Sequence, residues 1–225
     1  LHGKNKPFES CFTCKAKELL QPMKGDYWEP YLKKHLQISA TPVLDRQGNF
    51  EFLIQMVQDI TDKKITEQEI HLSRERAIYH NKIASAFLTI TNEKVYAEVL
   101  TIILNQFKAR YGFFGYINDN GDFVSASMTY DIWDECKMED KNIIFPKSSW
   151  TGVWGRALKE KKSVFQNAGL KLPKGHVQLK NTLASPILSG KKLIGLISLA
   201  NKEDDFTFEE QQTLESVCAY IAPIL

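Results

Sequence analysis

The sequence has no long apolar run. Its most hydrophobic stretch, residues 193–199, is interrupted by Gly195 and Ser198 and is far shorter than the roughly 20 residues that a membrane helix needs. Charge of one sign is also lacking, since 29 Lys and Arg stand against 27 Asp and Glu, for a net charge of +2. So small a charge creates no long-range field that attracts nucleic acid or an acidic membrane. We expect no nucleic-acid partner and no membrane contact.

Cysteine is scarce, with four residues in 225. That number is too small for a disulfide scaffold, and Cys136 and Cys218 have no partner nearby in the sequence. The chain begins at Leu1 without a basic and then apolar leader, which favours a piece of a longer protein over a secreted precursor. These features predict a cytoplasmic location.

The common catalytic motifs are missing. The sequence contains no Gly-rich phosphate loop, GxSxG elbow or HExxH motif, and the Glu209-Glu210 pair begins a predicted helix, where carboxylates stabilise the helix dipole. We therefore expect that this fragment is not an enzyme. Its 43% hydrophobic and 25% charged residues are typical of a globular protein, and its length favours two domains.

The first part of the chain predicts an antiparallel hairpin over residues 35–58. Apolar and polar residues alternate from His35 to Pro42, the turn formers of residues 45–49 follow, and residues 50–58 have the composition of a second strand. From Asp62 there is no Gly or Pro until Gly112, which favours a long helical stretch.

We expect that stretch to break into two helices near Asn92. The first carries an intermittent heptad stripe, which favours pairing with a second copy, although a solvated connector lying against its own domain is an equal alternative. The second, residues 93–110, has one apolar face and predicts a core-packing helix. The stripe of the first helix consists of Ile65, Leu72, Tyr79, Ile83, Ala86 and Ile90.

Further along, hairpins and short helices alternate. Asn120-Gly121 between two strand-like runs predicts a hairpin, and Ser189-Gly190 predicts a second one whose strands are residues 182–188 and 192–200. Thr207 and Glu210 form a capping box sequence that begins a last helix. Between the hairpins we expect a short strand at 143–146, a helix at 151–161, a short strand at 163–166 and a loop at 167–180.

The first 70 or so residues resemble the C-terminal half of the PAS domains of bacterial and archaeal sensor kinases. The likeness lies in LHGKNKPFESCFTCKA and in QISATPVLDRQGNFEFLIQMVQDITDKKITEQEI, which contains the PAS exit signature Asp59-Ile60-Thr61. Asp59 and Thr61 are expected to cap the first amides of the outgoing helix and thus to pass strand movement to it as a signal relay. The opening strands of such a domain are not recognisable.

The remainder is similar to GAF domains, through TGVWGRALKEKKSVFQNA, LPKGHVQLKNTLASPI and LIGLISLANK. The resemblance implies an α+β fold: an antiparallel sheet with flanking helices on one side and a ligand pocket on the other. We expect a partial PAS domain at 1–62, a helical linker at 63–91 and the GAF domain at 92–225.

Four residues of the GAF-like region are candidates for ligand binding: Trp150, Trp154, Asn167 and His176. In GAF domains their segments approach the pocket mouth, where aromatic rings can wall a ligand while Asn and His orient it. The alternatives are that the two tryptophans are core residues and that Asn167 caps a strand.

Cys11 and Cys14 have the C-x-x-C spacing that suits zinc or a redox dithiol, with His2 as a further ligand, or they are simply buried small residues. Cys136 lies among acidic residues, which raise a thiol pKa and disfavour a nucleophile.

Our leading hypothesis is a sensory fragment. A small-molecule ligand, or a signal from the PAS side, shifts the flanking helices of a homodimer, joined through linker and terminal helices, and acts on a downstream effector domain such as a histidine kinase or diguanylate cyclase. One alternative is a haem-dependent or redox sensor or enzyme that uses Cys136, Cys218 or His176. The other is a purely structural dimerisation module.

Overall fold

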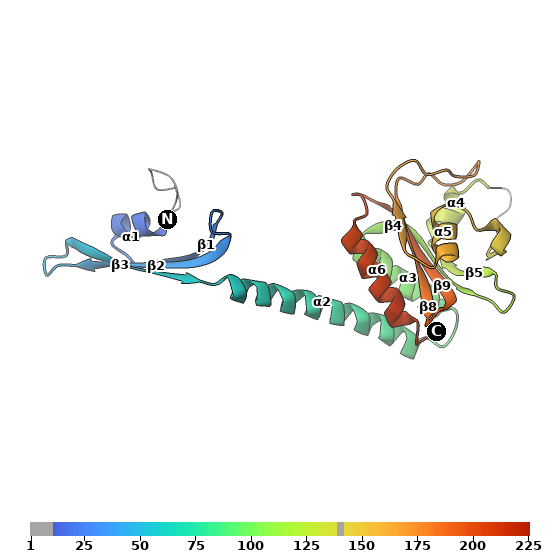
Figure 1. Cartoon of the computed structure of the whole chain (residues 1–225), viewed down its shortest axis with the longest axis horizontal. Helices are drawn as coiled ribbons and strands as arrows, with labels where there is room; N and C mark the ends of the chain where they lie inside the picture. Colours follow the sequence, from blue (N-terminus) through green and yellow to red (C-terminus); the bar gives the residue numbers. More distant parts are fainter. Residues whose placement is uncertain (1–10, 139–141) are drawn as a thin grey trace. The chain divides into compact units, whose positions relative to one another are not determined.

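The computed structural model describes residues 11–138 and 142–225 (Figure 1). The chain divides into two compact units, Leu1–Glu75 and Arg76–Leu225.

The first unit is a small antiparallel sheet with one helix on it. Helix α1 (Phe12–Leu19) precedes strands β1 (Met23–Glu29), β2 (Lys34–Leu44) and β3 (Phe50–Asp59), which pair in the order β1-β2-β3. The predicted hairpin is therefore confirmed, with its strands paired from Leu36 opposite Asp59 onward. The alternating side chains Leu36, Ile38 and Ala40 of β2 are buried, as a sheet with one covered face requires.

Two elements of this unit were not anticipated from the sequence, α1 and β1. Strand β1 reads MKGDYWE, whose Lys, Gly and Asp have low strand propensity, and it forms because all seven of its residues pair with β2. The ring of Phe12 in α1 occupies the place of a side chain at Gly25, since a Cβ there would stand 2.2 Å from the ring. This close approach seats the helix on the sheet.

Helix α2 (Thr61–Thr89) begins in the first unit and ends in the second, and α3 (Lys94–Phe107) follows after a break that includes Asn92, as predicted. The heptad stripe of α2 is buried toward the end of the helix and exposed near its start. Tyr79, Ile83 and Ala86 are buried in the core of the second unit, whereas Ile65 and Leu72 are exposed.

The second unit is built on a six-stranded sheet of order β6-β5-β4-β9-β8-β7, and every pair in it is antiparallel. The predicted α+β fold class is confirmed, because α-helices flank an antiparallel sheet. The strands are β4 (Ala109–Ile117), β5 (Phe123–Met128), β6 (Ile144–Phe145), β7 (Val164–Gln166), β8 (Thr182–Ser189) and β9 (Lys192–Lys202).

Helices cover one face of this sheet. The end of α2, α3 and α6 (Phe208–Ile221) share a core with inward side chains of β8 and β9 such as Leu183 and Ile197. Helix α6 begins at the predicted capping box, in which Thr207 and Glu210 each bond the other's backbone amide.

The opposite face carries the excursion between β5 and β8. It contains α4 (Tyr130–Glu135), the 3-10 turn η1 (Lys147–Ser149), α5 (Gly152–Glu160) and the loop 167–180. Figure 1 shows α5 and α6 on opposite sides of β8 and β9. Successive residues of β9 serve the two faces, since Leu196 packs with α5 and Ile197 with the helix layer. Among the described residues, no helix combines the length and the apolar character needed to cross a membrane.

Candidate functional site

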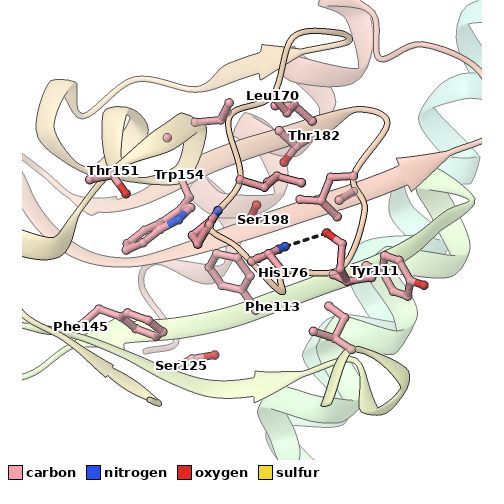
Figure 2. A pocket seen from close by; sticks show the side chains of 18 of the residues that line it. Tyr111, Phe113, Ser125, Phe145, Thr151, Trp154, Leu170, His176, Thr182 and Ser198 are labelled. Carbon is pink, nitrogen blue, oxygen red and sulfur yellow. Dashed lines mark hydrogen bonds between the residues drawn. The ribbon is translucent and has the colours of Figure 1, made fainter. Parts of the chain in front are cut away.

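A cavity of about 1060 Å³ lies between the sheet and the excursion. Its floor comes from β4, β5, β8 and β9, and its walls come from α5, the segments beside α4 and η1, and the loop 169–179. Figure 2 shows the side chains of the sheet and of the loop converging on this space. A cavity of this size is in the range that accommodates small-molecule ligands.

Aromatic rings form one continuous wall of the cavity. Trp154 of α5 meets Phe145 at 5.5 Å, Phe123 at 6.0 Å and Phe113 at 6.2 Å between ring centroids. Two of these contacts are edge-on, an arrangement that aromatic pairs favour. The predicted residue Trp154 therefore lines the cavity together with three phenylalanines that sequence reasoning did not single out.

The short hydroxyl side chains Thr182, Ser125 and Ser198 lie among the apolar residues of the floor. Thr182 donates to the Leu199 carbonyl at 2.9 Å, and Ser125 makes a long bond of 3.4 Å to the Ser127 carbonyl. Ser198, on the central strand β9, is only 4% exposed, and within the described part of the chain its hydroxyl forms no hydrogen bond. Because its hydroxyl opens onto the cavity, Ser198 offers a ligand or a water a hydrogen bond that the described residues do not supply.

His176 lies on the loop above this floor and lines the cavity (Figure 2). Its Nδ1 lies 2.7 Å from the Val177 carbonyl oxygen, which can only accept, so Nδ1 donates and Nε2 remains available. The loop is held in place beside it, because the Lys137 amide donates to the Gly175 carbonyl at 2.7 Å. Gly175 has φ +83°, a conformation that favours glycine.

The other two predicted residues have structural partners and do not line the cavity. Trp150 is 3% exposed and donates from Nε1 to the Phe145 carbonyl at 2.9 Å. Asn167 donates to the Phe206 carbonyl and accepts from the Phe206 amide, both at 2.9 Å, and thereby ties the start of the loop to the segment before α6. In both cases the structure corresponds to the non-ligand alternative.

The two cysteines of this unit lie in different places. Cys136 is buried and lines the cavity, whereas Cys218 of α6 belongs to the core on the helix side of the sheet. Burial raises the pKa of the Cys218 thiol to about 12, so this thiol is protonated and unreactive near neutral pH. The sheet therefore separates Cys218 from the cavity in which Cys136 and His176 lie.

In the first unit, Cys11 is buried at the start of α1 and Cys14 is exposed. Burial opposes the Cys11 thiolate, but hydrogen bonds from Cys14 and Thr13 outweigh it and lower the pKa of Cys11; the same thiol-to-thiol bond raises the pKa of Cys14. Across residues 11–138 and 142–225, no three His, Cys, Asp or Glu side chains gather closely enough to hold a metal ion. His2, the third ligand considered above, lies outside the described residues.

Asp59 and Thr61 join β3 to α2. Asp59 accepts from the Thr61 amide at 3.0 Å and the Thr61 hydroxyl at 2.6 Å. Its pKa is well below the usual range because it also binds Lys34, at 2.7 Å, and accepts these bonds. The Thr61 oxygen, which was expected to cap a helix amide, instead accepts from the His35 amide of β2 at 3.0 Å. The junction therefore ties the helix start to two strands.

Sequence reasoning missed Ser198. Residues 192–200 were predicted as a hairpin strand, and Ser198 within that strand was not among the predicted ligand-binding residues. The available signal was the polar residue itself, because a serine in a buried strand needs a partner.

Comparisons with known proteins agree with the architecture of the second unit. The GAF domain of an Acinetobacter phosphoenolpyruvate-protein phosphotransferase superposes with a TM-score of 0.52 at 11% identity, covering 67% of this chain and 92% of that one. A protein of Methanosarcina acetivorans named methyl sulfide methyltransferase-associated sensor is 26% identical over 182 residues, 76% of this chain and 18% of that protein. The chain thus spans less than a fifth of that relative's length.

One comparison corrects an expectation drawn from the sequence. The free methionine-R-sulfoxide reductase of Neisseria meningitidis, solved with its substrate, superposes with a TM-score of 0.50 at 14% identity and covers 67% of this chain and 89% of that one. An enzyme therefore has this fold, and the expectation that the fragment is not an enzyme is wrong as an inference from missing motifs. Those motifs belong to other folds, so their absence says nothing about chemistry in a cavity of this kind.

The family itself follows from the sequence match together with the fold. The model of the GAF domain matches residues 90–225, which is more than half of the chain. This range contains the whole six-stranded sheet, α3, α6 and the residues that line the cavity. The chain therefore belongs to the GAF domain family.

Proposed function

We propose that the second unit is a sensory module that binds a small molecule in the cavity and reports its presence through the flanking helices. The observation that carries this proposal is the cavity itself, whose aromatic wall and unpartnered Ser198 hydroxyl lie on the sheet face opposite the helices. The name of the Methanosarcina acetivorans relative, a sensor, supports the same role.

The central strands provide a route from the cavity to the helices. Ser198 of β9 faces the cavity, and its neighbours Ile197 and Leu199 pack in the helix-side core. On that side the ring of His80 in α2 stacks on Tyr220 of α6, with centroids 4.2 Å apart and an interplanar angle of 7°. A ligand that displaces β9 by a fraction of an ångström therefore changes the packing of both helices, which shifts the population of their arrangements.

The first unit supports the finer proposal of a partial PAS domain. Strand β3 is an edge strand, and one of its faces exposes Phe52, Ile54 and Met56. A half-domain that lacks its opening strands would show both features, an edge strand with unpaired backbone groups and an uncovered apolar face. The bonds of Asp59 and Thr61 then couple that sheet to α2, as a relay requires.

Homodimerisation through α2 is part of the proposal. Ile65 and Leu72, seven residues apart on α2, are exposed and suit a helix pair. Signals from the cavity and from the first unit would both converge on such a pair and pass to an effector domain of the full-length protein, of the histidine kinase or cyclase kind.

The test of ligand binding is a thermal-shift screen of a small-molecule library against the chain and against Ser198→Trp, which fills the cavity floor. Leu170→Trp, on the loop, serves as a second blocking variant in case Ser198→Trp does not fold, and Ser189→Trp, exposed at the end of β8, is the matched control. A ligand is expected to raise the Tm of the chain and of the control but not of the blocked variants. Equal shifts in all variants would place the binding elsewhere and defeat the proposal.

The helix relay has its own test. With Cys14 replaced by serine to remove the exposed thiol, Leu72→Cys is expected to form an intermolecular disulfide, at a rate that changes when a ligand from the screen is added. His71→Cys, an exposed neighbour off the stripe, is the control and should cross-link more slowly. A monomeric chain without cross-links contradicts the relay and leaves ligand binding to be judged by the screen.

A further inference from the structure

The mouth of the cavity carries positive charge that no described residue neutralises. Arg156 of α5 and Lys171 of the loop both line it, both are exposed, and neither forms an ion pair with a described residue. No Asp or Glu occurs among the described residues that line the cavity.

Near the cavity, Glu135 already has partners for its carboxylate. Glu135 at the end of α4 accepts from Arg110 at 2.6 Å and from the Tyr111 hydroxyl at 2.5 Å. Its charge is therefore paired with that of Arg110. A cleft with apolar walls focuses the field of Arg156 and Lys171, so the cavity mouth favours an anionic group.

The interior favours a flat apolar body. The rings of Phe113 and Trp154 stand edge to face at an interplanar angle of 86°, and Phe145 meets Trp154 at 65°. Rings packed edge to face form a wall of aromatic faces and edges, against which another planar ring system can pack with offset or edge contacts. Figure 2 shows Phe113, Phe145 and Trp154 on the same side of the space.

Ser198 and His176 add hydrogen-bonding groups to the cavity lining. The Ser198 hydroxyl lines the cavity without a described partner, and His176 has Nε2 available because Nδ1 donates to the Val177 carbonyl. Together they satisfy one hydroxyl or carbonyl substituent on the ligand ring, since each can accept and the serine can also donate.

We propose that the cavity binds an aromatic organic acid, with its ring system against the wall formed by Phe113, Phe145 and Trp154 and its anionic group at Arg156 and Lys171. This inference rests on the proposed ligand-binding function and names the ligand class of the same cavity. Charge selects the ligand at the mouth, and shape selects it inside.

The experiment compares two probes of the same shape by isothermal titration calorimetry: naphthalene-2-carboxylate and the neutral naphthalene-2-carboxamide. The carboxylate is expected to bind about tenfold or more tightly than the carboxamide at low salt, and the preference should shrink as salt is added. Arg156→Gln is expected to reduce the preference to about threefold or less. Lys159→Gln, an exposed lysine on the same helix that does not line the cavity, is expected to leave it unchanged.

Ser198→Trp, or Leu170→Trp if the first variant does not fold, should abolish binding of both probes. The inference is overturned if the carboxamide binds as tightly as the carboxylate, if the carboxylate does not bind at millimolar concentration, or if its binding survives the blocked cavity. These results do not decide the outcome of the library screen. A neutral compound that raises the Tm only when the cavity is open still supports the proposed function. The proposed function fails separately, when the screen yields no compound that distinguishes the blocked variants.

Discussion

Ser198 and Asn167 are both polar residues at buried or half-buried positions of the second unit, and their roles differ because their partners differ. Both the NH2 group and the oxygen of the Asn167 side chain form hydrogen bonds with the Phe206 backbone. Ser198 lies between Phe113 of β4 and Ala184 of β8, and the backbone groups around it pair within the sheet. Its hydroxyl lines the cavity and has no described partner. The first residue therefore stabilises the fold, and the second is free for binding.

Tyr79 of α2 is a buried residue with an unsatisfied group. Its hydroxyl is fully enclosed in the helix-side core and has no hydrogen-bond partner in the described structure. Tyr79→Phe removes that hydroxyl and keeps the ring, so we expect the free energy of unfolding to rise by about 1 kcal/mol. Urea denaturation measures it, with the exposed Tyr130→Phe as the neutral control; a loss of stability in Tyr79→Phe would contradict the assignment of an orphan hydroxyl.

At the scale of elements, α5 and the preceding turn show how the excursion is held to the sheet. Trp150, Val153 and Ala157 are buried against Ala184 and Leu196 of the sheet, which orients α5 so that Trp154 lines the cavity. The turn into the helix is tight, because a Cβ on Gly155 would stand 2.3 Å from the Trp150 carbonyl carbon.

Gly155→Ala tests that packing. The added methyl group meets backbone rather than a flexible side chain, so α5 must shift, and we expect a loss of about 1–3 kcal/mol in the free energy of unfolding. Lys159→Ala on the exposed side of the same helix should change it by less than about 0.5 kcal/mol. Equal effects of the two substitutions in chemical denaturation would show that α5 is not held by this contact.

At the scale of the whole molecule, the division into two units predicts independent folding of the second. Its core is formed by its own strands and by α2 from Tyr79 onward, together with α3 and α6. We expect a fragment of residues 76–225 to unfold cooperatively in calorimetry, with the Tm that this unit has in the full chain. A fragment without near-ultraviolet circular dichroism would show instead that the first unit is required.

Stability should also fall in alkaline solution. Burial raises the pKa of Cys218 from 9.0 to about 12 and raises that of Tyr79 as well, so between these values the unfolded chain releases protons that the folded chain keeps. The free energy of unfolding therefore decreases with pH over this window, by at most about 1.4 kcal/mol per pH unit for each group. Cys218→Ala should flatten the decrease measured by urea denaturation between pH 9 and pH 12; an unchanged slope would show that this thiol is not buried in solution.

The fold by itself does not separate a sensor from an enzyme. The inference from missing motifs failed because a solved reductase has the same architecture, so function on this fold depends on which side chains line the cavity. In this chain those side chains are an aromatic wall, a serine of β9, a histidine whose Nε2 is available, and two cations that form no ion pair with a described residue.

Elements whose signals are local could be predicted from the sequence. The alternation of β2, the apolar face of α3 and the capping box of α6 are set by neighbouring residues, so each was predicted with nearly its observed bounds. The GAF resemblance rested on such local runs too, and the family match confirmed it.

Which polar residues meet at one place depends on how distant segments of the chain fold together. Ser198, His176 and Arg156 lie on a strand, a loop and a helix, and the antiparallel order of the sheet brings them together around one cavity. Trp150 and Asn167 instead hold segments of the fold together, because their hydrogen-bond partners come from other segments of the chain. Strand β1 likewise exists through pairing rather than propensity, and pairing between distant segments is an energy that no short stretch of sequence contains.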